Sequence, residues 1–307
     1  MRSPSRSRRR WSIFTTLAVA WPTAASADSA PDEWRSGTYY AVHGTTTGAL
    51  LLGSELTRLL FLDGTPGYDP TWFPGDLSVR GNHSSQAARL SDTTFALALV
   101  VPVAGELGRG VGPAFGNAGV VYAETLSANL FLNTLVKFTV RRPRPYASAN
   151  AENGVPFPEP TEDGAESQIS FYSGHSSTTF AAAMSGSYLF AEHTPDRTSR
   201  CTMWASELAL AAATANLRVR AGKHYYSDVI AGALVGTGLG IGLPYLHGGR
   251  YRPELAEIAA AAGGVVVGML ATQLLPLGDK PSKSGGRGWT LAPLAGPVIG
   301  LQGSGSF

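Results

Sequence analysis

The chain has 307 residues, of which 44% are hydrophobic, so it is long enough to bury a full core. Its formal net charge is +2, and five of its arginines lie within the first ten residues, so the rest of the chain is near neutral or acidic. This balance excludes the basic surface of a nucleic-acid-binding protein, and the single cysteine, Cys201, excludes an intramolecular disulfide.

The first 27 residues have the three parts of a secretory signal peptide. An arginine-rich start precedes an apolar stretch from Trp11 to Trp21, and Ala25-Ser26-Ala27 is a small-residue cleavage signal. We therefore expect export by a cleavable signal peptide, through either the Sec or the twin-arginine route. An uncleaved membrane anchor is the alternative, which the short apolar run and the cleavage signal disfavour.

Apolar residues at helical spacing, with almost no strand-like alternation, predict an all-α fold. We expect helices over residues 37–61, 91–107, 116–140, 175–192, 203–219, 228–246 and 255–275. About six of them would form the core of an antiparallel bundle. Residues 281–288 have the composition of a linker, and the glycine-rich stretch 290–307 is expected to be a short strand or a loose tail.

Three short clusters of polar residues lie at the ends of these predicted helices. They are Lys137 with Arg144 and Pro145, then Ser173-Gly174-His175, then Arg218 with His224 and Asp228. Alone, each has an ordinary structural explanation: a basic helix C-terminus, a helix N-cap, and a pair of residues four apart on one helix. In an up-and-down bundle, however, these helix ends fall at the same pole, so one site can contain all three clusters.

Three cations, two imidazoles and one carboxylate suit metal-free phosphoryl transfer, because fixed donors must match the charge on the phosphate oxygens. The expected phosphate-binding residues are Lys137, Arg144, Arg218, Ser173 and the backbone N–H of Gly174. One histidine would attack phosphorus and the other would protonate the leaving group, while Asp228 would hold the second ring nitrogen of His224.

The remaining histidines, His43, His83, His193 and His247, have no spacing typical of a metal site. We expect them to be surface or core residues and assign them no role. No metal is expected at the phosphate site either.

The ordered patterns KxxxxxxRP, SGH and RxxxxxHxxxD resemble the type 2 phosphatidic acid phosphatase and vanadium haloperoxidase superfamily. Residues 137–145, 173–175 and 218–228 match these patterns, and the resemblance extends from about residue 90 to residue 247. Tyr172 and Leu217 depart from it, at positions where Pro and Ser are common. The resemblance implies that His224 is the nucleophile and forms a phosphohistidine. It also implies that His175 acts as general acid and then as general base.

These features predict a metal-independent phosphatase that needs no cofactor and is inhibited by vanadate. Its partner would be a phosphorylated small molecule or a lipid head group, including lipid phosphates and diphosphates. The alternative is a vanadium-dependent haloperoxidase, in which vanadate bound by His224 is the cofactor. A non-catalytic envelope protein that binds phosphate head groups is a further alternative. The oligomeric state is not indicated by the sequence.

The same elements suggest a division of the chain. After the signal peptide (1–27) come an N-terminal helix and loop (28–90), the phosphatase helical bundle (91–250), a C-terminal helix (251–280), and a linker with tail (281–307). The long stretch from Asn150 to Ser170 is compatible with a lid or rim over the pocket and with a solvated loop.

Two segments, Val229 to Leu246 and Ile258 to Leu275, are long and apolar enough to be membrane spans, and Phe95 to Val103 is apolar but short. The mean hydropathy of +0.02 is low for a protein with many spans. The sequence therefore leaves open a soluble or membrane-associated periplasmic bundle and a six-span enzyme whose site faces the periplasm.

Overall fold

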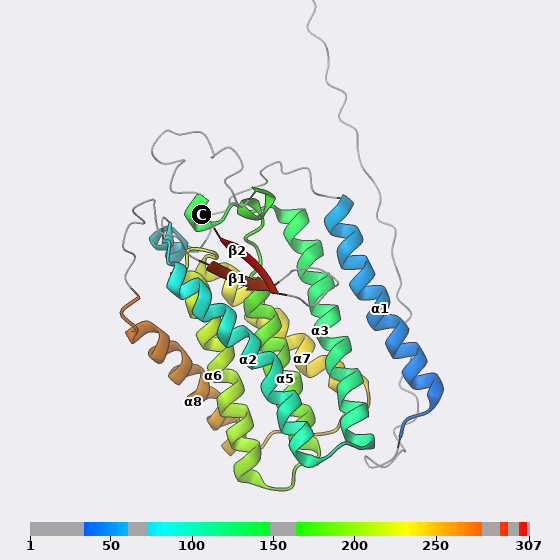
Figure 1. The fold of residues 1–307 in the computed structure, drawn as a ribbon. Coiled ribbons are helices and arrows are strands. Elements are labelled where there is room, and N and C mark those ends of the chain that lie inside the picture. The colour runs from blue at the N-terminus through cyan, green and yellow to red at the C-terminus, as the bar shows by residue number, and fades with distance from the viewer. Residues whose placement is uncertain are drawn as a thin grey trace, which may run out of the picture.

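The computed structural model describes residues 34–60, 73–80, 82–147, 164–277, 289–293 and 301–305. Its long helices (Figure 1) are α1 (Gly37–Leu60), α2 (Ser85–Arg109), α3 (Pro113–Val140), α5 (Gly174–Glu192), α6 (Arg197–Arg220), α7 (Tyr226–Leu246) and α8 (Leu255–Leu274). Two 3-10 helices, η1 (Pro74–Val79) and η2 (Gly164–Gln168), and an antiparallel pair of strands, β1 (Trp289–Pro293) and β2 (Leu301–Gly305), are also present. The all-α prediction is confirmed.

All seven predicted helices are present, and two of them begin about one and a half turns earlier than predicted. Ser84 caps α2, because its side chain accepts a hydrogen bond from the Ala87 N–H at 3.2 Å. Asp196 caps α6 in the same way through the Ser199 N–H at 2.7 Å. The predicted signal peptide, most of the 150–170 connection and the 281–288 linker lie outside the described residues.

Helix α5 is the centre of the bundle and packs against α2, α3, α6 and α7. Helix α1 packs on α3, and α8 packs on α6, so these two helices flank the bundle on opposite sides (Figure 1). Short connections join α2 to α3 and α5 to α6, and consecutive helices therefore alternate in direction.

Glycines bring α7 unusually close to α5. A Cβ on Gly236 would lie 2.1 Å from the Ser177 carbonyl oxygen, so only glycine permits this approach. Further along the two helices, Gly232 meets the backbone of Ser173 and Gly240 meets that of Ala181. The pairs advance in the same direction along both helices, so α5 and α7 run parallel and their N-termini lie at the same pole.

Three of the described helices, α2, α7 and α8, are long and apolar enough to cross a membrane. Large apolar side chains on them face outward: Val100, Leu234 and Leu270 are 59%, 69% and 55% exposed. In a protein surrounded only by water such side chains would be costly when gathered in numbers. The outward-facing apolar side chains are consistent with membrane association. The apolar segment at Phe95, which the sequence showed as short, belongs to the 25-residue helix α2.

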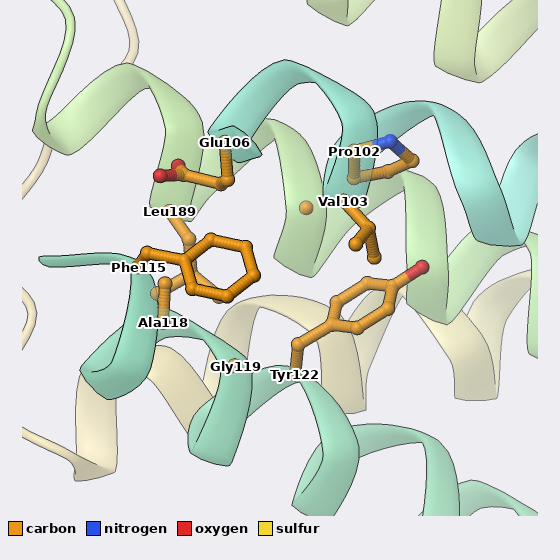
Figure 2. A pocket seen from close by; sticks show the side chains of 9 residues that line it. Pro102, Val103, Glu106, Phe115, Ala118, Gly119, Tyr122 and Leu189 are labelled. Carbon is orange, nitrogen blue, oxygen red and sulfur yellow. The ribbon is translucent and has the colours of Figure 1, made fainter. Parts of the chain in front are cut away.

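A small apolar cavity of about 50 Å³ lies between α2, α3 and α5 (Figure 2). Pro102, Phe115 and Tyr122 line it, and the carboxylate of Glu106 lies at its edge. Its volume is close to that of one or two water molecules. The cavity is therefore a packing feature of the core and too small for a substrate.

Candidate active site

Residues from all three clusters gather at one end of the bundle, which we call the cationic pole after Lys137, Arg144 and Arg218. Lys137 lies in the last turn of α3 and Arg218 in the last turn of α6, whereas Gly174 is the first residue of α5. The positive charges of all three cations act on His224. The structure thus brings the predicted site residues together at one pole.

The start of α5 has no room for a side chain at position 174. A Cβ there would lie 2.7 Å from Asn133 Oδ1 and 3.4 Å from Lys137 Nζ. Ser173 is fully buried, and its hydroxyl caps α5 by accepting a hydrogen bond from the Ser176 N–H at 3.3 Å. The N-termini of α5 and α7 both lie at this pole, and their partial positive charges favour an anion there.

His224 lies in the loop between α6 and α7 and is 1% exposed. Its Nδ1 lies 2.8 Å from the carbonyl oxygen of Ser170. Because a carbonyl oxygen can only accept, Nδ1 carries the proton and Nε2 keeps its lone pair. Burial, together with repulsion from Arg144, Arg218 and Lys137, lowers the pKa of His224 well below its ordinary value of 6.5. The ring is therefore neutral at neutral pH and has the tautomer that a nucleophilic Nε2 requires.

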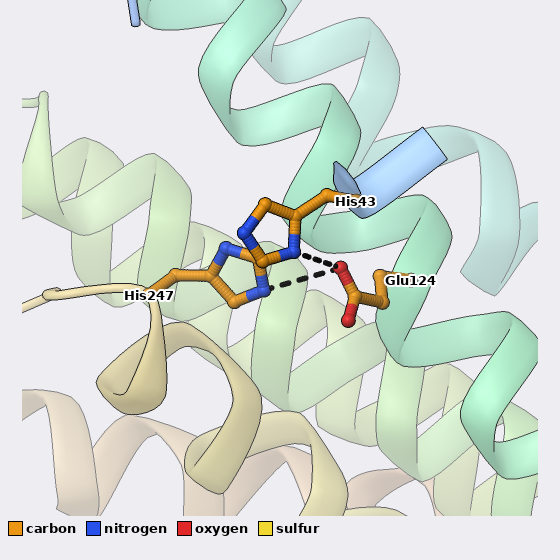
Figure 3. A group of neighbouring side chains, drawn as sticks. All are labelled: His43, Glu124 and His247. Carbon is orange, nitrogen blue, oxygen red and sulfur yellow. Dashed lines mark hydrogen bonds and ion pairs between the residues drawn. The ribbon is translucent and has the colours of Figure 1, made fainter. Parts of the chain in front are cut away.

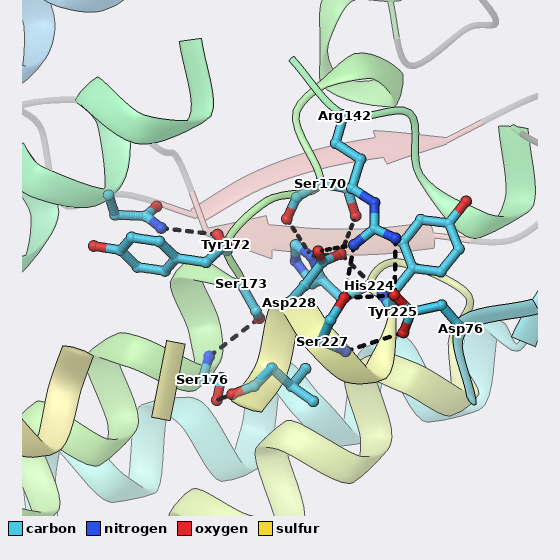
Figure 4. Close-up of polar contacts among 12 residues, drawn as sticks. Asp76, Arg142, Ser170, Tyr172, Ser173, Ser176, His224, Tyr225, Ser227 and Asp228 are labelled. Atoms are coloured by element: carbon cyan, nitrogen blue, oxygen red, sulfur yellow. Dashed lines mark hydrogen bonds and ion pairs between the residues drawn. The ribbon is translucent and has the colours of Figure 1, made fainter. Parts of the chain in front are cut away.

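The sequence led us to expect that Asp228 binds the His224 ring directly, but it does not. Its Oδ2 lies 3.7 Å from His224 Nδ1, which is beyond hydrogen-bond distance. The carboxylate instead accepts hydrogen bonds from the Ser170 hydroxyl at 2.5 Å and the Tyr225 N–H at 2.9 Å (Figure 4). Asp228 therefore fixes Ser170, whose carbonyl oxygen in turn orients His224.

A buried arginine, Arg142, holds this arrangement in place. Its guanidinium donates to Asp228 Oδ1 at 2.7 Å and to Asp76 Oδ2 at 2.9 Å, and it lies 3.9 Å above the ring centre of Tyr225 (Figure 4). Asp76, in η1, also accepts hydrogen bonds from the backbone and hydroxyl of Ser227. Although burial alone would lower it, the two carboxylates raise the pKa of Arg142. This charge is matched within the protein and belongs to the scaffold of the site.

His175, the second residue of α5, pairs with a carboxylate that the sequence did not indicate. Its Nε2 lies 3.0 Å from Asp92 Oδ1 on α2. Burial and the charge of Arg218 lower the pKa of His175 to about 4, against the opposing effect of Asp92. The ring is therefore neutral at neutral pH.

Arg218 and Lys137 have few carboxylates near them. Arg218 donates to Ser91 Oγ at 3.3 Å and lies 3.6 Å from Asp92, and burial followed by repulsion from Arg144 lowers its pKa to about 10. Burial, then repulsion from Arg144 and Arg218, lowers the pKa of Lys137 to about 7. Such mutual repulsion among cations is relieved by a bound anion with several negative oxygens.

A model of the PAP2 superfamily matches residues 118–252, a span that contains all three clusters. The match confirms the resemblance of this segment to the type 2 phosphatidic acid phosphatase superfamily. Members of this superfamily are phosphatases, which makes phosphoric ester hydrolysis the general reaction class. No curated protein and no solved structure matches the chain.

The two departures from the PAP2 pattern have structural explanations. Leu217 is buried against Ala87 and Ala221, between α2 and α6, so its side chain serves packing. Tyr172 is also buried, and its carbonyl oxygen accepts a hydrogen bond from Asn133 Nδ2 at 2.9 Å. Neither difference removes a charged residue of the site.

Sequence reasoning missed three charged residues that shape the PAP2 site. Arg142 lies within the first motif, between Lys137 and Arg144, where its burial has no sequence signal. Asp76 and Asp92 precede the matched segment, and no motif links either of them to the pole. Asp76 and Asp92 reach the pole because η1 packs against α7 and α2 packs against α6.

Proposed function

We propose that this protein is a metal-independent phosphatase that cleaves phosphate esters through a phosphohistidine on His224. The observation that carries the proposal is the buried His224 ring, whose Nδ1–H is held by Ser170, whose Nε2 keeps its lone pair, and whose pKa is lowered by burial and by three cations. A nucleophile that is uncharged and oriented, next to donors for the phosphate oxygens, is the arrangement that phosphoryl transfer requires.

In the first step, the lone pair of His224 Nε2 attacks phosphorus, and the bond to the leaving oxygen breaks with its electron pair on oxygen. His175 supplies the proton that this oxygen needs. In the second step, His175 takes a proton from water, the water oxygen attacks phosphorus, and the P–N bond returns its electrons to Nε2. Lys137, Arg144, Arg218, Ser173 and Gly174 hold the phosphate oxygens during both steps.

The charge of the substrate itself prepares His175 for this role. The pKa of His175 is lowered to about 4 by burial and by the nearby Arg218. A bound phosphate dianion offsets that positive charge and raises the pKa, so the ring gains its proton when substrate binds. Asp92, 3.0 Å from Nε2, supports the protonated ring.

The favoured substrate is a phosphate carried by a lipid. Three helices apolar and long enough to span a bilayer, with outward-facing apolar side chains, support a bundle embedded in a membrane. The cationic pole lies at the ends of the helices, where a lipid head group meets water. The predicted signal peptide favours the periplasmic face for this pole, and vanadate would bind there as an inhibitor.

The test is rapid acid-free quenching of the protein with a radiolabelled lipid phosphate and with p-nitrophenyl phosphate. We expect an acid-labile phosphoenzyme in the wild type and none in His224→Ala, and we expect EDTA to leave hydrolysis intact because cations of the protein bind the phosphate. Phosphate release by His224→Ala at the wild-type rate would overturn the proposal. Halide oxidation that appears only with added vanadate and peroxide would instead indicate a haloperoxidase.

A further inference from the structure

A second cluster of ionisable side chains lies away from the cationic pole, where α1, α3 and the end of α7 meet (Figure 3). It consists of His43 on α1, Glu124 on α3 and His247, which directly follows α7. Glu124 precedes Lys137 by thirteen residues on the same helix, which corresponds to about 20 Å along its axis. The cluster is therefore separate from the residues proposed for phosphoryl transfer.

Both imidazoles approach the same carboxylate oxygen. His43 Nδ1 lies 2.8 Å and His247 Nε2 lies 3.3 Å from Glu124 Oε2, and the three ligand atoms lie within 4.8 Å of one another. In a tetrahedral zinc site with bonds of about 2.0–2.1 Å, neighbouring ligand atoms are roughly 3.3 Å apart. Small movements of the side chains would thus place all three around one ion.

The second ring nitrogen of His247 is held as in many metal-binding histidines. Nδ1 lies 2.6 Å from the hydroxyl of Tyr39, whose oxygen can accept a hydrogen bond from Nδ1–H and so orient the ring with a lone pair on Nε2 when a metal ion binds. The side chain is 3% exposed, and Nε2 faces the Glu124 carboxylate at 3.3 Å. A metal ion bound by Nε2 and this carboxylate would replace that direct contact.

The cluster is accessible from a cavity of about 230 Å³. His247 and Tyr39 line this cavity together with Arg35, Glu192 and Arg250. It offers a route for an ion and space for water at an open coordination position.

We propose that His43, Glu124 and His247 bind a divalent transition-metal ion of the zinc type. Two imidazole nitrogens and one carboxylate oxygen form a known donor set for zinc, whereas calcium and magnesium prefer oxygen ligands. The ion links α1 to α3 and to the end of α7. Since α1 reaches the bundle mainly through α3, this link fastens a peripheral helix to the core.

The test uses the full-length chain without a histidine tag, stripped of metal by a chelator. Equilibrium dialysis measures Zn²⁺ uptake, and visible absorption measures Co²⁺ uptake. We expect one equivalent of either ion to bind, with the intense Co²⁺ absorption of a four- or five-coordinate site. Tyr39→Phe should weaken binding by about 10–100-fold, and His247→Ala or Glu124→Gln should weaken it further. His83→Ala is the matched control, since His83 is exposed and outside the cluster.

The wild-type Co²⁺ spectrum and Tyr39→Phe, which keeps every ligand, also cover the case in which a ligand variant does not fold. Absence of stoichiometric uptake by the wild type would overturn the proposal. So would uptake at wild-type strength in both folded ligand variants. The result does not depend on phosphatase activity, because binding is measured without a phosphate substrate.

Discussion

The cationic pole and the His43–Glu124–His247 cluster each contain two histidines, but the charge around His224 is opposite to that around His43 and His247. At the pole, Arg144, Arg218 and Lys137 surround His224, and together with burial they lower its pKa. In the cluster, both imidazoles face the carboxylate of Glu124. Neutral imidazoles next to excess cations can serve an anionic substrate, whereas imidazoles next to a carboxylate form a set of donors for a cation.

The two regions also share a feature of hydrogen bonding. In each ring Nδ1 has a hydrogen-bond partner, the Ser170 carbonyl oxygen for His224 and the Tyr39 hydroxyl for His247, and Nε2 is the proposed reactive or ligating atom. The surrounding charge therefore separates the proposed nucleophile from the proposed ligand.

Exchanging a histidine for alanine in each region gives the largest contrast. We expect His224→Ala to lower kcat by roughly 10⁴-fold or more, because the variant has no atom to accept the phosphoryl group. His247→Ala should keep kcat close to that of the wild type while it loses metal binding. Steady-state hydrolysis of p-nitrophenyl phosphate measures kcat for both variants, after circular dichroism has established that each variant folds. Equal loss of kcat in the two variants would show that the regions are not independent.

A smaller effect is expected at the proposed general acid. His175→Ala should lower kcat for an alkyl or lipid phosphate by about 10²–10⁴-fold, because the alkoxide then leaves without a proton. For p-nitrophenyl phosphate, whose leaving group needs little protonation, the loss should be much smaller. Comparison of the two substrates with one enzyme preparation measures the difference. The same loss for both leaving groups would assign His175 to binding or positioning.

Within the pole, Arg142 and Arg218 should respond differently to removal of their charge. Arg142→Met leaves the buried carboxylates of Asp76 and Asp228 without their cation, so we expect the free energy of unfolding to fall by about 3–5 kcal/mol. Arg218→Met removes a cation whose surroundings disfavour its charge. It should lower kcat/KM with a smaller loss of stability. Denaturant unfolding of both variants distinguishes the scaffold charge from the binding charge, and equal stability losses would contradict the distinction.

The sequence predicted the helices well, because they rest on local patterns. Apolar spacing placed seven helices, and the motif residues Lys137, Ser173 and Arg218 lie at helix ends that the fold brings together. The early starts of α2 and α6 were missed because their first turns are polar, and only the caps Ser84 and Asp196 mark them.

What the sequence did not predict depends on contacts between distant segments. Asp92 reaches His175 across 83 positions, and His43 reaches Glu124 across 81. Spacing rules search along one helix, so they could not group His43 with His247. The same limit explains Asp228: four residues after His224 on a helical pattern, it was expected at the ring, but Arg142 and Ser170 hold it 3.7 Å away.

The smallest expected effect is a change in pH dependence at Lys137. Burial, then repulsion from Arg144 and Arg218, lowers its pKa to about 7, so the side chain is charged below that pH and neutral above it. A bound anion favours the charged form, and binding above pH 7 must therefore take up a proton. Above pH 7 we expect vanadate inhibition to weaken more steeply for the wild type than for Lys137→Arg, which stays charged. The difference between the two enzymes should be up to about tenfold per pH unit. Because the ionisation of vanadate is common to both enzymes, the difference between the two profiles isolates Lys137. Parallel profiles would contradict this expectation, because they would mean that Lys137 keeps its proton above pH 7 in the free enzyme. Burial and repulsion from the neighbouring arginines would then lower its pKa much less than stated.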